Sequence, residues 1–229
     1  MFRFSITQLF GIFFLSVLFV VSAFIVSCAA DEENRRYPAL LSEFVEVTTT
    51  SSARLDLLCT DAGERLPVSN SASIETSRLT PDSTYRAIGR YERVLSDNGV
   101  WEATLYALQL IPSSYAVSAS SFSEIKRDPV AMQSLWRGGN YLNIILLVKA
   151  QNGKHLFRFI DEGMISSADG VNTFSFSLYH DAAGDVEAYT QKVYLSIPLS
   201  PYAEYLSVGD TLSFAIPTSE GTQVWKTIY

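Results

Sequence analysis

Cysteine is scarce in this sequence, since Cys28 and Cys59 are the only two in 229 residues. If Cys28 carries a lipid, as argued below, Cys59 has no partner for a disulfide within the chain. Cys59 ends the apolar-rich run over residues 55–59, and a lone buried cysteine behaves as a small hydrophobic side chain. We therefore expect a fold without crosslinks that rests on hydrophobic cores, with Cys59 packed in one of them.

Histidine is equally scarce, and His155 and His180 are the only two. Neither belongs to a cysteine cluster or a His-x-x-x-His spacing, so the ligand set of a structural zinc site is missing. His180 precedes Asp181 and Asp185, which could suggest a hydrolase, but no serine lies in a Gly-x-Ser-x-Gly elbow. Because Asp and Gly are typical of turns, we interpret this segment as a loop. The sequence predicts no catalytic residues, no metal site and no cofactor, and hence a protein that is not an enzyme.

Basic residues are outnumbered, with 17 Lys and Arg against 24 Asp and Glu and a formal net charge of −7. A nucleic-acid-binding domain needs a basic footprint, so we exclude nucleic acid as a partner. Charge is almost missing from the N-terminal region, where Arg3 is the only charged residue before Asp31. Removal of a leader that contains Arg3 would shift the formal charge from −7 to −8.

The N-terminal region has the order of a signal peptide: Arg3, an apolar stretch over residues 9–26, and small residues before a cleavage point. Residues 25–28 resemble a lipobox, in which an aliphatic residue three positions before the cysteine and a small residue just before it admit lipoprotein signal peptidase. This resemblance makes Cys28 the predicted lipid attachment site, with a diacylglycerol and usually a third acyl chain on its amine. Two or more acyl chains give stable anchoring, so we expect a permanent membrane tether.

Both parts of this N-terminal interpretation have an alternative. About 20 apolar residues span a bilayer, so an uncleaved anchor is the first alternative, although acidic rather than basic residues follow the stretch. Asp31, Glu32 and Glu33 resemble the signal that exports lipoproteins of the Bacteroidota to the cell surface, and a solvated, flexible tether is the second alternative. We expect lipid anchoring in the outer membrane, with cell-surface display preferred to a periplasm-facing location.

The remainder of the chain is dominated by β-strand patterns with frequent turn signals, which are typical of a sandwich or barrel. Asn152-Gly153 suits a type I′ turn, so we predict a hairpin between the strands over residues 141–149 and 155–160. A second hairpin is expected between residues 173–180 and 188–197. The other predicted strands cover residues 44–50, 54–57, 84–91, 100–111, 130–136, 211–216 and 222–228.

A change of composition marks the best candidate for a domain boundary. Residues 113–123 are mostly Ser and Ala, and residues 126–129 form a charged cluster that ends in Pro129. We therefore expect two β domains, one on each side of this segment.

The second part of the chain, taken with the lipobox, resembles the NigD-like lipoproteins of the Bacteroidota. The resemblance lies in the hydrophobic strand that begins at Tyr141, the segment over residues 178–185, and the turn and strand over residues 207–212. It implies an all-β fold with a small OB-like barrel followed by an immunoglobulin-like β-sandwich. The expected organisation is a lipoprotein signal peptide over residues 1–27, an acidic flexible tether over 28–42, the OB-like barrel over 43–118 and the β-sandwich over 119–229.

Two functions fit these features. The first is a non-enzymatic, lipid-anchored envelope lipoprotein that binds a protein partner, and the resemblance to the NigD-like family adds bacteriocin immunity as one version of this role. The alternative is a surface lipoprotein that binds glycans, because the second half is rich in aromatic residues that can stack on sugar rings. For this alternative, Tyr205 and Trp225 are the candidate ligand platform.

Overall fold

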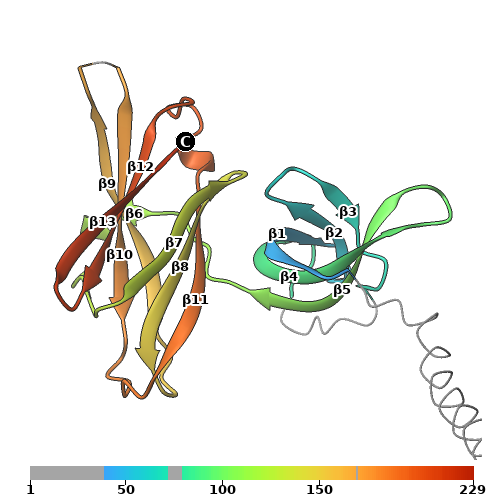
Figure 1. The fold of residues 1–229 in the computed structure, drawn as a ribbon, viewed down its shortest axis with the longest axis horizontal. Coiled ribbons are helices and arrows are strands. Elements are labelled where there is room, and N and C mark those ends of the chain that lie inside the picture. Colours follow the sequence, from blue (N-terminus) through green and yellow to red (C-terminus); the bar gives the residue numbers. More distant parts are fainter. Residues whose placement is uncertain (1–38, 72–78, 169) are drawn as a thin grey trace, which may run out of the picture. The chain divides into compact units, whose positions relative to one another are not determined.

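The strands of the chain form three β-sheets in the computed structural model, which describes residues 39–71, 79–168 and 170–229 (Figure 1). Residues 40–229 cluster as a single compact unit by their contacts. Apart from short 3-10 turns, the regular structure of the described residues is entirely β. The predicted all-β class is therefore confirmed.

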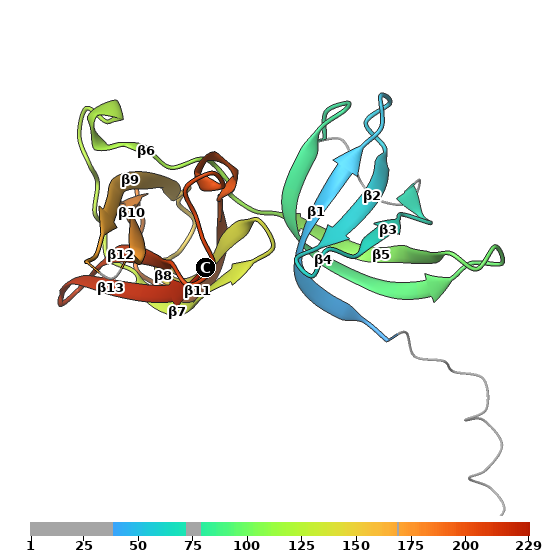
Figure 2. The same cartoon turned by 90° about the horizontal axis from the view of Figure 1, so that it is seen from above.

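The first sheet has five antiparallel strands in the order β3-β2-β1-β4-β5. It curls into a half-barrel (Figure 2), and a parallel bridge from Val68 to Ala103 of β5 brings its two edges together. This half-barrel sheet corresponds to the predicted OB-like barrel. Its strands are β1 (Leu41–Thr49), β2 (Leu55–Thr60), β3 (Arg65–Pro67), β4 (Thr84–Leu95) and β5 (Trp101–Leu110).

Alternating side chains on these strands enclose a core inside the curl, as a period of two requires. Val45, Leu58 and Tyr91 are fully buried members of this core. Gly89 lies where β4 crosses the core, and a Cβ atom at this position would be 2.9 Å from Cγ2 of Val45. The absence of a side chain at Gly89 therefore lets β4 lie close against β1.

The other two sheets pack face to face as a β-sandwich, which Figure 2 shows in a view along the strands. One sheet has the order β13-β12-β10-β9-β6 and the other has the order β11-β8-β7. β10 pairs in parallel with β12, and β6 pairs in parallel with β9. The strands are β6 (Val117–Ser118), β7 (Ala131–Gly138), β8 (Tyr141–Ala150), β9 (Leu156–Ser166), β10 (Asn172–Asp181), β11 (Tyr189–Pro198), β12 (Thr211–Thr218) and β13 (Gly221–Ile228).

Apolar side chains from both sheets fill the sandwich core. Phe159 of β9, Phe176 of β10 and Phe214 of β12 are among its largest fully buried side chains, and Ile144 and Leu146 of β8 face them from the other sheet. The rings of Phe159 and Phe214 meet in an edge-to-face contact at 6.3 Å. Phe174, Phe176 and Leu178 are all buried, as their period-two spacing predicts.

Both predicted hairpins are wrong, because the strands on either side of each loop belong to different sheets. β8 pairs with β7 and β11, whereas β9 pairs with β10 and β6. A type I′ turn needs positive φ at both central residues, and neither Asn152 nor Gly153 has one. Instead, the backbone N–H groups of Gln151 and Asn152 donate to the carboxylate of Asp185, at 2.7 and 3.2 Å. The segment is therefore an arch that crosses from one sheet to the other.

The sequence-predicted signal peptide, the lipid attachment site Cys28 and the acidic residues Asp31, Glu32 and Glu33 lie outside the described residues. Within the part of the chain that the structure describes, there is no helix long and apolar enough to cross a membrane. Cys59 does not join a core as expected, because the alternation of β2 buries Leu58 and leaves Cys59 half-buried on the other side.

Candidate functional site

A buried arginine connects the half-barrel sheet to the sandwich. The side chain of Arg86 on β4 is only 1% exposed, and its Nη2 lies 2.7 Å from the carboxylate of Asp61 in the turn after β2. The same nitrogen donates to Oδ1 of Asn143 on β8 at 2.9 Å, and Nε donates to Oγ of Ser196 on β11 at 3.3 Å. We call these four residues the polar joint.

The sandwich members of the polar joint hold each other in place. Asn143 and Ser196 are register partners on β8 and β11, and the Ser196 hydroxyl donates to Asn143 Oδ1 at 2.7 Å. The amide of Asn143 also donates to Asp61 at 2.7 Å. Because Asn143 and Ser196 are fully buried, these hydrogen bonds offset the cost of removing polar groups from water.

Aromatic rings complete the surroundings of the guanidinium. Cζ of Arg86 lies 4.0 Å from the centre of the Tyr141 ring and 5.5 Å from that of Phe44. Its Nη1 is buried without a hydrogen-bond partner among the described residues. The negative faces of aromatic rings attract a cation. The two rings therefore stabilise the guanidinium partly in place of the hydrogen bond that Nη1 does not make.

A glycine makes room for the polar joint. Gly138 is the last residue of β7, and a Cβ atom there would lie 2.2 Å from Oδ2 of Asp61 and 2.5 Å from Nδ2 of Asn143. Any side chain would therefore collide with two atoms that are already held by hydrogen bonds. The next residue, Gly139, has a φ of +54° and begins the tight turn into β8.

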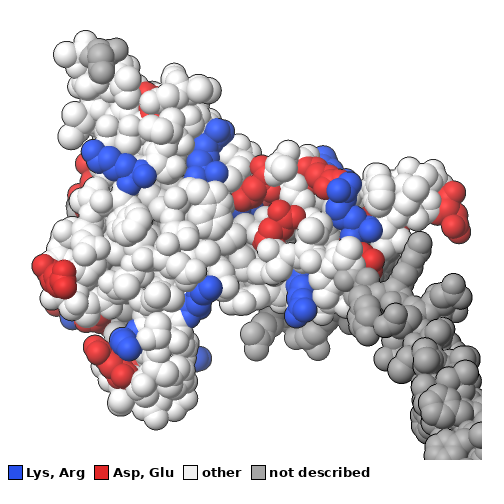
Figure 3. Space-filling model, viewed as in Figure 1, with Lys and Arg blue, Asp and Glu red and all other residues white. Residues whose placement is uncertain are grey.

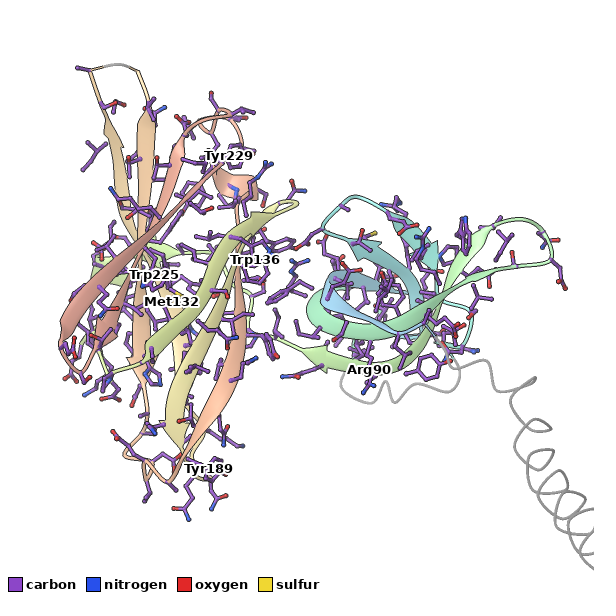
Figure 4. All side chains as sticks on the ribbon, in the orientation of Figure 1. Arg90, Met132, Trp136, Tyr189, Trp225 and Tyr229 are labelled. Carbon is purple, nitrogen blue, oxygen red and sulfur yellow. The ribbon has the colours of Figure 1, made fainter. Side chains whose placement is uncertain are left out.

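A cavity of about 330 Å³ opens beside the polar joint, and we call it the acidic aromatic cavity. The Phe44 ring makes edge-to-face contacts with Trp136 at 5.2 Å and with Tyr194 at 5.9 Å. Figure 4 shows Trp136 on β7. The cavity is lined by Ser42, Glu43, Phe44, Asp61, Ile88, Trp136, Ile145 and Tyr194.

A second cavity, of about 530 Å³, includes Arg86 and Tyr141 in its wall. The Tyr141 hydroxyl donates to the carboxylate of Glu46 at 2.6 Å. Burial, and then this hydrogen bond, raise the pKa of Tyr141, so its hydroxyl stays protonated and remains a donor. The remaining residues that line this cavity are Thr84, Ser113, Ser114, Tyr115, Asn140, Pro198 and Ser200.

The two histidines, which are distant in sequence, form a hydrogen-bonded chain in the sandwich. His155 Nδ1 lies 2.8 Å from Nε2 of His180, and His155 Nε2 lies 3.3 Å from the Asp185 carboxylate. At the other end, Nδ1 of His180 lies 2.9 Å from the carbonyl oxygen of Asp128. The Phe157 ring stacks on His180 with ring centres 4.7 Å apart.

This arrangement leaves no ring nitrogen of either histidine available to activate a nucleophile. The Asp128 carbonyl can only accept, so His180 carries its proton on Nδ1 and accepts from His155 at Nε2. The Asp185 carboxylate lies at the remaining ring nitrogen of His155, Nε2. The structure thus supports a structural role for this segment, in which His180 and Asp181 end β10 and residues 182–185 form the loop. No group of three or more metal-ligating side chains occurs within the described ranges.

Because of the histidine chain, we expect the free energy of unfolding to decrease as the pH falls from 7 to 5. Burial is the main cause that lowers the pKa of His180 below its ordinary 6.5. Below pH 6.5 the unfolded chain therefore binds a proton that folded His180 resists, and the free energy of unfolding decreases by up to about 1.4 kcal/mol per pH unit. Denaturant titrations at several pH values measure this slope, and His180→Gln is expected to flatten it.

The charged groups around His180 set the limits of this pH range. His155 and the carboxylates of Asp128 and Asp181 affect the pKa of His180. Asp185 lies beside Nε2 of His155, at the other end of the histidine chain. The amide N–H of Gln151 is the main cause that lowers the pKa of Asp185 below 3.8, so its contribution is lost only below about pH 4. Equal slopes between pH 7 and 5 in the His180→Gln variant and the unmodified protein would contradict the prediction.

Comparisons with known proteins identify the family of this fold. Residues 114–229 match the family model of the NigD-like C-terminal beta sandwich domain. The crystal structure of a NigD-like immunity protein from Bacteroides caccae is 30% identical, with a TM-score of 0.65, and the match covers 83% of this chain and 93% of that chain. The chain belongs to the NigD-like family. The predicted resemblance is thus confirmed.

Other solved structures share the fold of this NigD-like chain at lower identity. A candidate toxin-related protein from Parabacteroides distasonis is 20% identical, with a TM-score of 0.63 and coverage of 83% of this chain and 93% of that chain. A candidate lipoprotein from Bacteroides fragilis is 13% identical, with a TM-score of 0.59 and coverage of 84% and 97%. A comparison with curated proteins gave no significant match.

The predicted platform residues of this NigD-like protein are both accessible. Tyr205 follows the short 3-10 helix η3 (Ser200–Tyr202) and is 62% exposed, while Trp225 lies on β13 and is 40% exposed (Figure 4). Among the described residues, no ring contact or hydrogen bond joins Tyr205 to Trp225. The structure therefore exposes each ring without uniting them in one site.

Sequence reasoning did not find the polar joint of this NigD-like chain. Arg86 and Asp61 lie in an ordinary strand and turn, where charged residues usually face water. Asn143 interrupts the apolar run over residues 141–148, and this polar residue was the one local signal of a buried hydrogen-bonded site. Its partners lie 57 and 82 residues away, so the chain pattern could not identify them.

Proposed function

We propose that this NigD-like chain is a lipid-anchored lipoprotein of the cell envelope that binds a protein partner and does not act as an enzyme. The lipobox around Cys28 supports anchoring, with outer-membrane location and surface display following from the acidic residues after it. The relative from Bacteroides caccae, an immunity protein, supports a protein as partner.

The observation that carries partner binding is the acidic aromatic cavity. Phe44, Trp136 and Tyr194 bring three aromatic rings together in a cavity whose lining also includes the acidic residues Glu43 and Asp61. Aromatic residues beside fixed polar groups are typical of the centres of protein interfaces. The buried polar joint fixes these residues relative to each other, which lowers the entropy cost of binding. On the face in Figure 3, charged side chains of both signs lie closer together over the half-barrel sheet than over the sandwich.

Site-specific photo-crosslinking in intact cells tests this proposal. We expect a photoreactive residue at Ser42, which is exposed and lines the cavity, to form a protein adduct in the membrane fraction. The matched control is the same residue at Val208, which is 92% exposed, and it should form little adduct. Cys28→Ser should remove the chain from the membrane fraction because the lipid cannot be attached.

Two outcomes would overturn the proposal. Retention of the Cys28→Ser protein in the membrane fraction would contradict lipid anchoring at this residue. Equal adducts at Ser42 and Val208, or none at Ser42, would contradict partner binding at the cavity.

Glycan binding by Tyr205 and Trp225 is the alternative function. It gains no support from geometry, because neither ring lies in a described cavity with the other.

A further inference from the structure

We infer that the second cavity, whose wall includes Arg86 and Tyr141, binds a single neutral sugar ring, a role that goes beyond the proposed binding of a protein partner. Its volume of about 530 Å³ lies within the range of small-molecule sites, which is roughly 300–1,000 Å³. Neither Tyr205 nor Trp225 lines this cavity. The inferred site is therefore separate from the ligand platform that the sequence predicts.

Strand register places polar side chains on the facing walls of the second cavity. Glu46 on β1 is the register partner of Arg86 on β4, and Thr84 lies two residues before Arg86, so the three side chains share one face of the half-barrel sheet. On the facing sheet, Pro198 of β11 is the register partner of Tyr141 on β8. The centre of the Tyr141 ring lies 4.0 Å from Cζ of Arg86, and its hydroxyl donates to Glu46 at 2.6 Å. These contacts fix the walls of the cavity relative to each other.

Many hydroxyl and amide groups of the lining residues are available to a ligand. Pro198 is the one purely apolar residue among the described residues that line the cavity, whereas ligand sites are usually lined mainly by apolar side chains. An apolar ligand would cover these polar groups without giving them partners, but a ligand with its own hydroxyl groups can both donate to them and accept from them. The lining residues whose side chains form no hydrogen bond with any described residue are Thr84, Ser113, Ser114, Tyr115, Asn140 and Ser200.

Charge favours a neutral ligand. One basic residue, Arg86, and one acidic residue, Glu46, line the cavity, so its wall attracts neither a cation nor an anion selectively. Oε1 of Glu46 accepts from Tyr141, and Oε2 forms no hydrogen bond with a described residue. This second carboxylate oxygen can therefore accept from a hydroxyl group of the ligand.

An exposed aromatic ring favours a sugar over a polar ligand without a ring. Tyr115 lines the cavity, is 57% exposed and has no ring contact with another described residue. A sugar ring has apolar C–H faces and hydroxyl groups around its edge. The faces can pack against the ring of Tyr115, while the edge can bond to the polar groups of the wall.

NMR titrations of the full chain, in a detergent without a sugar headgroup, test this inference. The probes are glucose, galactose and mannose, each as the free sugar and as its methyl glycoside. We expect saturable binding of at least one of these neutral sugars. Sorbitol has similar hydroxyl groups but no ring, and it should bind roughly tenfold more weakly because it cannot pack on an aromatic face.

Two variants locate this binding in the second cavity. Tyr115→Ala removes the exposed ring, and Glu46→Gln keeps an acceptor for Tyr141 while it removes the charged acceptor, so each should weaken binding roughly tenfold. Tyr205→Ala and Glu43→Gln are the matched controls. Tyr205 is similarly exposed, at 62%, and Glu43 lines the acidic aromatic cavity. Neither control should change the binding, and unchanged thermal unfolding of all four variants shows that the fold is kept.

Three outcomes would overturn the inference: no binding of any of these sugars, binding that neither Tyr115→Ala nor Glu46→Gln weakens, or tighter binding of a charged uronic acid or amino sugar than of its neutral parent. The probes also distinguish two sources of the sugar ring. A methyl glycoside reproduces the linked end of a glycan, so its binding supports a glycan end as the ligand. Binding of the free sugar alone supports a free sugar.

Discussion

Replacing Arg86 with alanine is expected to lower the free energy of unfolding by about 3 kcal/mol or more. The substitution leaves the Asp61 carboxylate without its cation, and it removes a donor from both Asn143 and Ser196, which are fully buried. Asp61 is 20% exposed and regains some water, so the expected loss lies at the lower end of the range for broken buried ion pairs. Denaturant unfolding of the full chain measures this loss.

Two controls make the Arg86 experiment specific. Arg90→Ala removes an exposed arginine from the same strand, and its effect should stay within about 0.5 kcal/mol. The double variant Arg86→Met with Asp61→Leu should recover only the part of the loss that comes from leaving the Asp61 carboxylate without its cation, because Asn143 still lacks its partners. A loss for Arg86→Ala no larger than that for Arg90→Ala would show that the polar joint does not stabilise the fold.

The Phe214→Ala variant is expected to be destabilised by about 3–5 kcal/mol, since it would leave a cavity in the sandwich core. Phe214 is fully buried on β12 and packs against Phe159. The half-barrel core shares no residue with the sandwich core. We therefore expect hydrogen exchange to accelerate in the sandwich strands before it does so around Leu58.

A matched apolar truncation at the surface controls for this result. Val208→Ala also shortens a hydrophobic side chain of the sandwich, but Val208 is almost fully exposed, so its effect should be within about 0.5 kcal/mol. If Phe214→Ala accelerated exchange equally in both parts, the two cores would unfold as one cooperative unit, contrary to the prediction.

Much of the strand content could be predicted from local pattern, whereas strand pairing could not. Phe174, Phe176 and Leu178 alternate, and the structure buries all three. The Asn152-Gly153 pair predicted a hairpin because such a turn is a local property. The actual partner of its backbone is Asp185, more than 30 residues away, and this contact turns the chain into an arch between sheets.

The candidate site was hidden from the sequence for a similar reason. Each member of the polar joint is an ordinary polar residue by itself, and only the fold brings Arg86 next to Asn143 and Asp61. The sequence shows that the second half is rich in aromatic residues. Tyr194 and Trp136 form a cluster only because both contact Phe44, which belongs to another sheet. The family resemblance predicts the fold, whereas the site depends on contacts between residues that are far apart in the sequence.

Gly138 offers a way to sort related sequences by how their β domains are joined. A chain that carries any side chain at the corresponding position would have no space for a carboxylate like that of Asp61 against Asn143. In such a relative, other contacts would have to connect the half-barrel sheet to the sandwich, or the two parts would move relative to each other. The identity of this single residue should therefore separate family members with a fixed joint from those with a hinge.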